Sequence, residues 1–423
     1  MTRSHYPVLV IGGGQAGLSA SHFLKQQGID HLIFEKNRRG HAWREERWDN
    51  FCLVTPNWQC QLPDFPYAGA DPFGFMKKDE ILAYLDAFIA KEQPPLREGV
   101  TVNALRQRDE GGFVVETSDG TYTADQVVVS VGGYHIPNIP RVAERLPRNI
   151  LQVHSSRYRS SEALPPGAVL VVGSGQSGCQ IAEDLKIDGR KVHLCVGSAP
   201  RSPRRYRGRD AVEWLHDMGH YDLPVERHPL GEKVRGKANH YLTGRDGGRE
   251  IDLRRHALDG MALHGRLLDV DDGRMVFADD LAANLDAADA TYNRIRDGID
   301  AYLAEQGIDA PQEPPYVPLW QPAPGEGGGA LDLEAAGIST VIWATGFRPN
   351  FTWVEVPVFD GRGYPTHKRG VSACPGLYFL GLPWLHTWGS GRFSGIARDA
   401  AFVVESIVAR QGDTPLDGQR LSA

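Results

Sequence analysis

The sequence predicts an α/β protein with two Rossmann-like dinucleotide-binding domains. The first observation is a Gly-rich loop, GGGQAG at 12–17, which directly follows the apolar segment 7–11. The second is a similar loop, GSGQSG at 173–178, which follows the apolar segment 168–172. The third is the length of 423 residues, which is enough for two or three domains that each bury their own core.

Each loop is expected to join a buried parallel strand to a helix, because closely spaced glycines let the chain turn tightly and approach a diphosphate. The first helix is predicted to run to about Gln27, with Gly28 behind it, and the next strand to cover 31–35. The second helix is predicted to run to about Ile187, with Gly189 behind it, and the next strand to cover 191–196. One such loop would be a weak signal, whereas two in the same context indicate two nucleotide sites.

The remaining elements are predicted from shorter patterns. A helix opens at Asp79, where apolar residues begin to recur at helical spacing, and short strands follow around 100–105, 113–117 and 122–131. A hairpin is expected at 271–273, a helix at 281–305 and a last strand at 340–344. The polar region from about 200 to 325 shows no pattern that assigns it a function of its own.

Composition excludes several classes of protein. The net charge of −7 argues against a nucleic-acid binder, and no segment approaches the unbroken apolar length that a bilayer requires. The five cysteines contain no C-x-x-C pair, so neither a metal site nor a dithiol redox centre is predicted. The first residues resemble no export signal, and a cytoplasmic location is expected.

The strands after the two loops differ in a way that selects the cofactors. Glu35 ends the first of these strands, about 20 residues beyond the loop, where a carboxylate accepts hydrogen bonds from ribose hydroxyls, as in FAD. The equivalent position after the second loop is Val196, which would not repel a 2′-phosphate. Guanidinium groups bind phosphate well, so the arginines that follow favour NADPH over NADH; these are Arg201, Arg204, Arg205 and Arg207. The alternative is that these arginines form only a run that is solvated or contacts nucleic acid.

These assignments predict a discontinuous FAD-binding domain formed by 1–165 and 326–423. An NADPH-binding domain is predicted at 166–325, with a polar insertion of uncertain role from about 200 onwards.

Further motifs resemble those of the flavin-containing monooxygenase family, the class B flavoprotein monooxygenases, and in particular its small bacterial and YUCCA-like members. They are HSSRY at 154–158, ATGF at 344–347, YFLGLP at 378–383 and DFP at 64–66. Two departures stand out. The first half of the motif that ends in HSSRY is missing, and Val54 stands where many members carry an asparagine, with Asn57 three residues on.

The resemblance implies a two-dinucleotide flavoprotein fold and places the segment after 381 beside the flavin. No catalytic residue is assigned, and the flavin-proximal candidates are Asn57, Trp384, His386, Trp388 and Arg392. The predicted cofactor-binding residues are Gly12, Gly14, Gln15, Ala16, Gly17, Glu35, Lys36, Trp43, Gly173, Ser174, Gly175, Gln176, Ser177, Gly178, Arg201, Arg204, Arg205, Thr345, Gly346 and Gly381.

The resemblance also implies a reaction, in which NADPH reduces FAD, O2 forms a C4a-hydroperoxide on the reduced flavin, and a nitrogen or sulfur atom of a small organic substrate is oxygenated. An alternative is an NAD(P)H-dependent oxidoreductase or oxidase that passes electrons on without inserting oxygen. A flavin-binding sensor without catalysis is disfavoured, because both loops are intact. The expected partners are a small-molecule substrate and O2, without nucleic acid or membrane, and the prediction allows for a homodimer.

Overall fold

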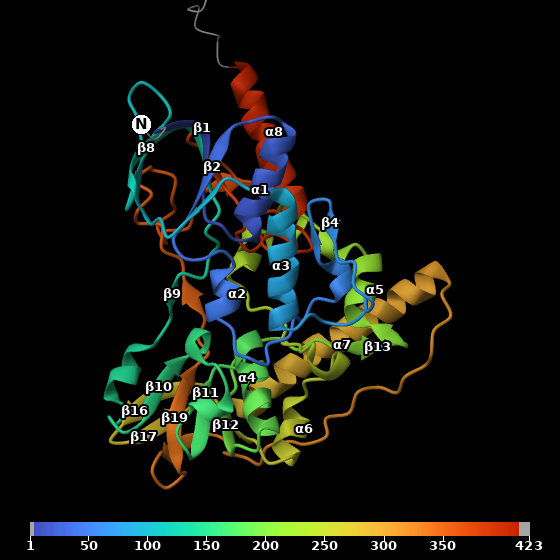
Figure 1. The fold of residues 1–423 in the computed structure, drawn as a ribbon. Coiled ribbons are helices and arrows are strands. Elements are labelled where there is room, and N and C mark those ends of the chain that lie inside the picture. Colours follow the sequence, from blue (N-terminus) through green and yellow to red (C-terminus); the bar gives the residue numbers. More distant parts are fainter. Residues whose placement is uncertain (1–3, 414–423) are drawn as a thin grey trace, which may run out of the picture.

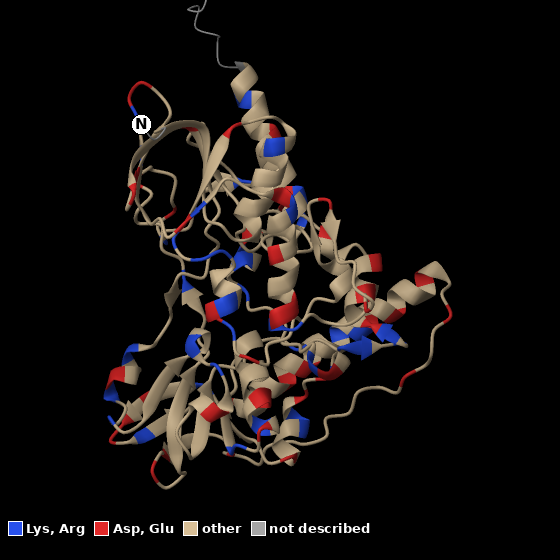
Figure 2. Ribbon diagram, in the orientation of Figure 1, with Lys and Arg blue, Asp and Glu red and all other residues tan. Residues whose placement is uncertain are grey.

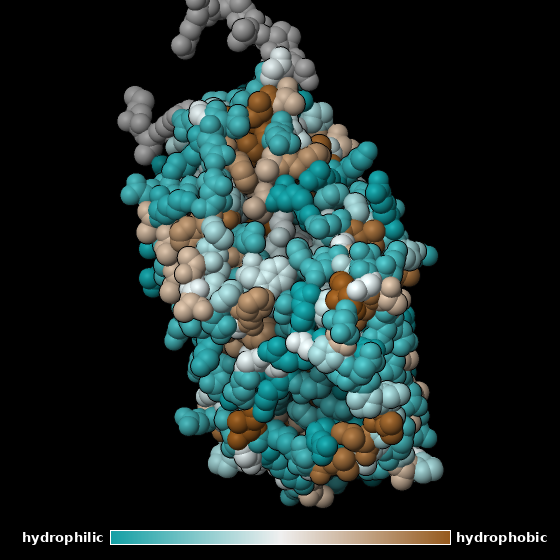
Figure 3. All heavy atoms as spheres, turned by 90° about the vertical axis from the view of Figure 1, so that its right-hand side faces the viewer, coloured by the Kyte–Doolittle hydropathy of each residue, from teal (hydrophilic) through white to brown (hydrophobic). Residues whose placement is uncertain are grey.

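The computed structural model describes residues 4–413, which form two lobes, each built around a parallel sheet (Figure 1). The ends of the first predicted domain, 1–3 and 414–423, lie outside the described residues. Among residues 4–413, no helix combines the length and the apolar character that a bilayer crossing would require. The face in Figure 3 is largely hydrophilic, with hydrophobic residues in small separate groups.

The first lobe contains a sheet in the order β21-β22-β23-β8-β1-β2-β5. Its parallel centre consists of β1 (His5–Ile11), β2 (His31–Glu35), β5 (Leu96–Glu98), β8 (Gly120–Val129) and β23 (Leu377–Phe379). The edge strands β21 (His367–Lys368) and β22 (Val371–Ser372) are antiparallel.

Helices cover one face of this sheet and an antiparallel ribbon extends it over the other. The helices are α1 (Gln15–Gln26), α3 (Lys78–Glu92) and α8 (Ile396–Asp413), whose apolar residues share one core with β1. The ribbon consists of β6 (Val102–Gln107) and β7 (Phe113–Thr117), which pairs with β8 and contributes to a second core. The helix and the three strands predicted between the two loops are confirmed.

The second lobe contains a parallel sheet in the order β10-β19-β11-β12-β15. Its strands are β10 (Leu151–His154), β11 (Ala168–Val172), β12 (Val192–Cys195), β15 (Ala262–His264) and β19 (Ile338–Trp343). On one face lie α4 (Gln176–Ile187), α6 (Leu253–Leu258) and the start of α7 (Leu281–Gln306). On the other lies an antiparallel sheet of β16 (Leu267–Asp271), β17 (Arg274–Phe277) and β18 (Gly329–Asp332).

Sheet membership differs from the predicted domain boundaries. The strands β10 and β19 both pair within the second sheet, although the sequence assigns 151–154 and 338–343 to the first domain. The chain therefore leaves the first sheet after β8 and returns to it only after β19. A Gly-rich loop marks where a nucleotide-binding strand ends, but it carries no information about strands that join the same sheet from elsewhere in the chain.

The polar region after 200 extends the second lobe and packs on the C-terminal half of α7. The short strands β13 (Arg205–Tyr206) and β14 (Arg209–Asp210) lead into α5 (Ala211–Asp217), and Trp214 shares a small core with Ile299 and Leu303 of α7. The hairpin predicted at 271–273 and the long helix are confirmed. The remaining short elements are α2 (His41–Glu45), β3 (Gln61–Leu62), β4 (Phe65–Pro66), β9 (Ile136–Pro137), β20 (Phe347–Arg348) and the 3-10 turns Asn57–Gln59, Arg141–Arg145, Ser155–Arg157, Ser161–Ala163, His220–Asp222, Val225–Arg227, Gly231–Gly236 and Arg245–Gly247.

Candidate cofactor-binding sites

The first Gly-rich loop forms a cradle at the N-terminus of α1. A Cβ on Gly12 would lie 2.6 Å from the carbonyl oxygen of Ser130, and one on Gly17 would lie 2.0 Å from the carbonyl oxygen of Gly12. Both positions therefore require glycine for packing. Gly14 is different, because a Cβ there would meet nothing within 4 Å, and as the N-cap it offers no side-chain hydrogen bond. The free N–H groups of the first turn consequently face an open space that suits a diphosphate.

The second loop repeats this arrangement at α4. A Cβ on Gly173 would lie 2.7 Å from the carbonyl oxygen of Ala344, and one on Gly178 would lie 1.8 Å from the carbonyl oxygen of Gly173. Gly175, like Gly14, has open space beside it and caps its helix without a side chain. The two loops are thus equivalent in geometry as well as in sequence, and each fits a dinucleotide diphosphate.

The glutamine after each cradle has the same role in both lobes. The side-chain nitrogen of Gln15 donates to the carbonyl oxygen of Gly391, at 3.0 Å, and that of Gln176 donates to the carbonyl oxygen of Leu242. Each glutamine therefore fastens a loop that comes from far along the chain beside the N-terminus of its helix. The side chains Ala16, Ser174 and Ser177 complete the predicted loops, and Ser174 Oγ accepts a hydrogen bond from the N–H of Gly197.

The carboxylate of Glu35 lies at the end of β2, next to the first loop. One of its oxygens accepts a hydrogen bond from the N–H of Gly13 and the other from the N–H of Asn37, both at 2.8 Å. Each oxygen retains a lone pair, so ribose hydroxyls could also bind there. The neighbouring Lys36 is exposed. At the corresponding place in the second lobe, Val196 is buried and its N–H donates to the carbonyl oxygen of His264.

Trp43 and Gly381 both lie against the first turn of α1. The indole nitrogen of Trp43 donates to the side-chain oxygen of Gln15, and its ring stacks on Phe393 with centroids 5.7 Å apart. A Cβ on Gly381 would lie 2.7 Å from the Cβ of Ala16. The structure therefore places both residues beside the first cradle.

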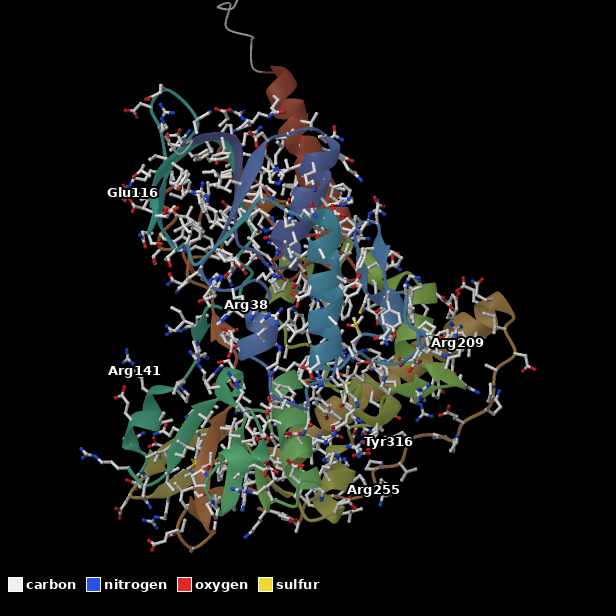
Figure 4. The ribbon with its side chains drawn as sticks, in the orientation of Figure 1. Arg38, Glu116, Arg141, Arg209, Arg255 and Tyr316 are labelled. Atoms are coloured by element: carbon white, nitrogen blue, oxygen red, sulfur yellow. The ribbon has the colours of Figure 1, made fainter. Side chains whose placement is uncertain are left out.

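The predicted phosphate role is wrong for Arg201, because internal carboxylates surround its guanidinium group. The side chain is 2% exposed and forms ion pairs with Glu250, Asp252 and Asp289 at 2.9–3.1 Å. Its guanidinium group also lies 4.9 Å from the ring centre of Tyr316, which Figure 4 labels in the second lobe. This arginine holds the polar region of the lobe together and has no free face for a cofactor.

The predicted phosphate role is also wrong for Arg204, and Arg205 and Arg207 offer little support for a phosphate site. Arg204 is 1% exposed, and its Nη2 donates to both carboxylate oxygens of Asp210. Arg207 pairs with Asp300 at 2.7 Å. Only Arg205 is exposed, and it donates one hydrogen bond to the carbonyl oxygen of Gly247.

The chain crosses between the two lobes in two segments, the first containing β9 and the second containing β20, and these two crossings pair with each other. The strands β9 and β20 form an antiparallel ribbon, and the hydroxyl of Thr345 donates to the carbonyl oxygen of Asn138. His154 Nε2 lies 3.0 Å from the carbonyl oxygen of Gly346, while its Nδ1 accepts a hydrogen bond from the N–H of Ser156. Burial lowers the pKa of His154, which fits this neutral ring. Thr345, Gly346 and His154 therefore tie the crossings together.

The last residue of the HSSRY motif secures the first crossing to α4. Tyr158 is fully buried, and its hydroxyl donates to the carboxylate of Asp184 at 2.8 Å. Asn50 and Arg245 donate to the other oxygen of the same carboxylate. Burial beside this carboxylate raises the pKa of Tyr158.

The flavin-proximal candidates divide into two groups. Asn57 serves its own loop, because its amide oxygen accepts from the N–H of Met76 and its amide nitrogen donates to the carbonyl oxygen of Asp71. Both amide atoms of this residue are therefore engaged with its own loop. The other four lie together in the loop before α8, which Gln15 fastens to the first cradle; they are Trp384, His386, Trp388 and Arg392.

The side chains of this loop have different surroundings. Trp384 is buried beside Val225 and Val234, and burial lowers the pKa of His386. Trp388 packs on Tyr221 with ring centres 4.5 Å apart. The guanidinium group of Arg392 lies over Trp388, at 4.0 Å from the ring centre.

Sequence reasoning missed Arg47, which follows Trp43 by four positions. Its guanidinium group lies 5.2 Å from the ring centre of Trp43 and 5.6 Å from that of Phe51. The arginine stands two residues beyond the end of α2, so no helical spacing in the sequence indicated it.

All five cysteines are buried and unpaired. Burial raises the pKa of Cys52 to about 11 and that of Cys60 to about 12, so these thiols stay protonated near neutral pH. Within residues 4–413, no cluster of side chains could hold a metal ion.

Comparisons with known proteins agree with this geometry. Residues 9–217 match the pyridine nucleotide-disulphide oxidoreductase family model. A CzcO-like oxidoreductase of Geobacillus kaustophilus is 33% identical over 404 residues, which are 95% of this chain and 98% of the relative. The probable indole-3-pyruvate monooxygenase YUCCA1 of Arabidopsis thaliana is 33% identical over 200 residues, which are 45% of this chain and 47% of that protein.

A solved structure shares the architecture over nearly the whole chain. The flavin-containing monooxygenase of Stenotrophomonas maltophilia superposes with a TM-score of 0.65 at 20% identity, covering 96% of this chain and 99% of that one. The fold class predicted from the two loops is therefore confirmed. The chain belongs to the family of the CzcO-like oxidoreductases, and it has the fold of the flavin monooxygenases.

Proposed function

We propose that this protein is an NADPH-dependent FAD monooxygenase that oxygenates a small organic substrate at a nitrogen or sulfur atom. The observation that carries the proposal is the pair of equivalent cradles, each with an open-sided glycine at a helix N-terminus. Relatives that match a little under half of the chain are named as monooxygenases, which supports the reaction class. The co-substrates in this proposal are O2 and the small molecule, and the location is the cytoplasm.

Glu35 supports FAD at the first cradle. Its carboxylate is fixed by two backbone N–H groups beside the loop, where it would accept hydrogen bonds from a ribose with free hydroxyls. Bound FAD would supply the chemistry of the reaction by accepting a hydride and passing electrons to O2. The side chains of the chain contribute orientation and shelter from water, since the loop before α8 and Trp43 both lie against the same helix turn.

NADPH is proposed for the second cradle on narrower grounds. Val196 places no carboxylate where a 2′-phosphate would lie, and this supports NADPH as the sequence suggested. The buried arginines add no support, so Arg205 is the one member of the predicted cluster with an exposed guanidinium group. A difference between NADPH and NADH is therefore expected to be modest, on the order of tenfold, which is the effect of about 1.4 kcal/mol.

The proposal is tested with purified protein reconstituted with FAD. The protein should bind FAD stoichiometrically, and NADPH should reduce the flavin faster than NADH does. With thioanisole as the added substrate and 18O2 as the oxidant, mass spectrometry should find one labelled oxygen in the sulfoxide product.

Two results would contradict the proposal in different ways. Failure to bind FAD would refute the cofactor assignment itself. NADPH oxidation that yields hydrogen peroxide in equal amount, with no label in any organic product, would favour the oxidoreductase that transfers electrons without inserting oxygen.

A further inference from the structure

A segment of the second lobe, residues 219–240, contacts the loop before α8 in the first lobe. We call this segment the cap. It follows α5 in the chain, in the part of the lobe where Figure 2 shows acidic and basic residues side by side. Within the described residues, its regular structure consists of the 3-10 turns His220–Asp222, Val225–Arg227 and Gly231–Gly236.

The buried apolar residues of the cap pack on the first lobe and not on the large core of their own lobe. Val225 and Val234 are 1% and 6% exposed, and they form a small core with Trp384. Trp388 packs against the same core. Lys233, which directly precedes Val234, is exposed. The cap is therefore apolar on the side that contacts the loop and charged on the side that faces solvent.

Hydrogen bonds also hold the cap to the loop. The N–H of Val225 donates to the carbonyl oxygen of His386 at 2.7 Å. Nε of Arg235 donates to the carbonyl oxygen of Trp384 at 3.2 Å. The guanidinium group of Arg235 also pairs with Glu232 within the cap, at 3.0 Å. Arg235 therefore links the cap to the backbone of the loop.

The contact between the cap and the loop connects the two cradles. Arg392 of the loop donates to the side-chain oxygen of Asn239 at the end of the cap, at 2.9 Å. The carbonyl directly before Arg392 is held by Gln15 of the first cradle. The carbonyl three positions after Asn239 is held by Gln176 of the second cradle. The cap therefore lies beside the place where the two dinucleotides of the proposed function would meet.

Trp384 has a strained backbone conformation beneath the cap. Its φ is 52°, in the left-handed region that bulky side chains seldom adopt. Arg235 binds its carbonyl oxygen, and the ring of His228 lies 5.2 Å from its indole ring. Such strain persists where the surrounding structure holds a residue in place, and it is concentrated at functional sites. The conformation of Trp384 therefore depends on contacts from the cap.

The cap is held more weakly than the lobes that it joins. Its buried apolar residues belong to a small core, whereas the sheets of both lobes have large cores of their own. In the part of the chain that the structure describes, no strand lies within 219–240. Segments with few buried apolar contacts open at a lower free energy than sheet cores do. The cap is therefore able to open while both lobes stay folded.

We propose that the cap covers the place where the two cofactors meet and keeps water from it, and that Arg235 is the positioning residue that holds the cap and Trp384 in the closed arrangement. The inference rests on the proposed function, because oxygenation requires a site that is sheltered from water. In the productive reaction, one atom of O2 enters the substrate and the other leaves as water. Water at the site favours a side reaction, in which NADPH, a proton and O2 yield NADP+ and hydrogen peroxide.

The test compares the FAD-loaded wild-type protein with three variants, Arg235→Met, Arg235→Lys and Lys233→Met. Methionine removes the hydrogen bond to Trp384 and keeps an apolar stem, whereas lysine keeps a cation that can donate to the same carbonyl. Lys233→Met is the matched control, because it removes an exposed cation from the same 3-10 turn.

Three quantities are measured for each protein. The first is hydrogen–deuterium exchange of its backbone amides, followed by mass spectrometry of peptides. The second is the rate at which NADPH reduces the flavin in the absence of O2. The third is the rate of hydrogen peroxide formation from NADPH and O2 without any organic substrate.

In Arg235→Met, the amides of 219–240 and 384–392 should exchange about 3- to 10-fold faster, the effect of losing one hydrogen bond, while those of β1 and β11 stay unchanged. Hydrogen peroxide formation should rise by a similar factor. Flavin reduction should stay within about twofold of the wild-type rate, because neither cradle is altered. Arg235→Lys should lie closer to the wild type, and Lys233→Met should equal it.

Unchanged exchange in Arg235→Met, or exchange that is faster throughout the chain, would overturn the positioning role of Arg235. Faster exchange of the cap with an unchanged rate of peroxide formation would overturn the exclusion of water. A wild-type protein that does not bind FAD, or whose flavin is not reduced by NADPH, refutes the proposed function. An FAD-loaded, reducible protein in which Arg235→Met changes neither exchange nor peroxide formation refutes only the role of the cap.

Discussion

Replacing Arg204 by alanine should destabilise the second lobe and leave the choice between NADPH and NADH unchanged. Arg204 and its partner Asp210 are 1% and 3% exposed, and Nη2 of the arginine contacts both carboxylate oxygens. A second nitrogen donates to the carbonyl oxygen of Val54 in the first lobe, at 2.9 Å. The substitution would therefore leave a buried carboxylate without its cation and remove a link between the lobes.

The cost follows from the burial of this pair. Removing one partner of a buried ion pair costs about 3–5 kcal/mol, because the remaining charge stays desolvated. For a folding unit of this size, such a loss lowers the melting temperature by about 6–20 °C. The assay is thermal unfolding followed by circular dichroism, together with KM values for NADPH and NADH measured well below the melting temperature.

Two variants serve as controls for Arg204→Ala. Arg205→Ala removes an exposed arginine with one hydrogen bond, and its melting temperature should change by about 2 °C or less. The double substitution Arg204→Met with Asp210→Leu removes both charges and should recover much of the loss, apart from about 1 kcal/mol for the N-cap of α5. Unchanged stability of Arg204→Ala together with a KM that rises for NADPH alone would refute the reasoning and restore the phosphate role.

Two further predictions concern buried polar groups of the second lobe. His193 and His264 stack with ring centres 5.2 Å apart, and desolvation lowers the pKa of each to about 4. Below pH 6.5 these histidines bind protons in the unfolded chain but not in the folded chain, so the melting temperature should fall as the pH drops from about 6.5 to 4. His264→Gln should make this fall shallower. A pH dependence equal to that of the wild type would contradict the lowered pKa values. Tyr158→Phe should cost about 1–3 kcal/mol in urea unfolding by removing the hydrogen bond to Asp184, and a free energy of unfolding equal to that of the wild type would count against this role.

The nucleotide-binding elements could be predicted because their signals are local. The strand, the turn and the helix N-terminus of each cradle lie within about 20 consecutive residues, and the glycines are required by contacts inside the same unit. The position of Glu35 could be predicted for the same reason, because it lies only about 20 residues beyond the first loop. The crossing residues were harder to interpret, because the role of His154 depends on the carbonyl of Gly346, almost 200 positions later.

The arginine cluster shows why charge alone could not be interpreted correctly. Arg201 forms ion pairs with Glu250, Asp252 and Asp289. The sequence of 201–207 does not reveal that the fold brings these distant carboxylates to the arginine. The amide of Asn57 bonds to Asp71 and Met76 in the loop that follows it, and the short motif around Asn57 does not reveal these partners. The sequence motif around Arg392 predicted that this residue lies near the flavin. The position of Arg47 near the first cradle depends on the packing of Trp43 against α1, which the sequence does not show.

The central claim is that two equivalent cradles hold two different dinucleotides. The most direct test is a calorimetric measurement of FAD and NADP+ binding to Gly14→Ala and Gly175→Ala. Both glycines have negative φ, −81° and −71°, and no atoms within 4 Å of an added Cβ, so each variant should fold normally while its methyl group occupies the diphosphate position. Gly14→Ala should lose FAD, and Gly175→Ala should keep FAD but lose NADP+. Wild-type affinity of both variants for both dinucleotides would contradict the account.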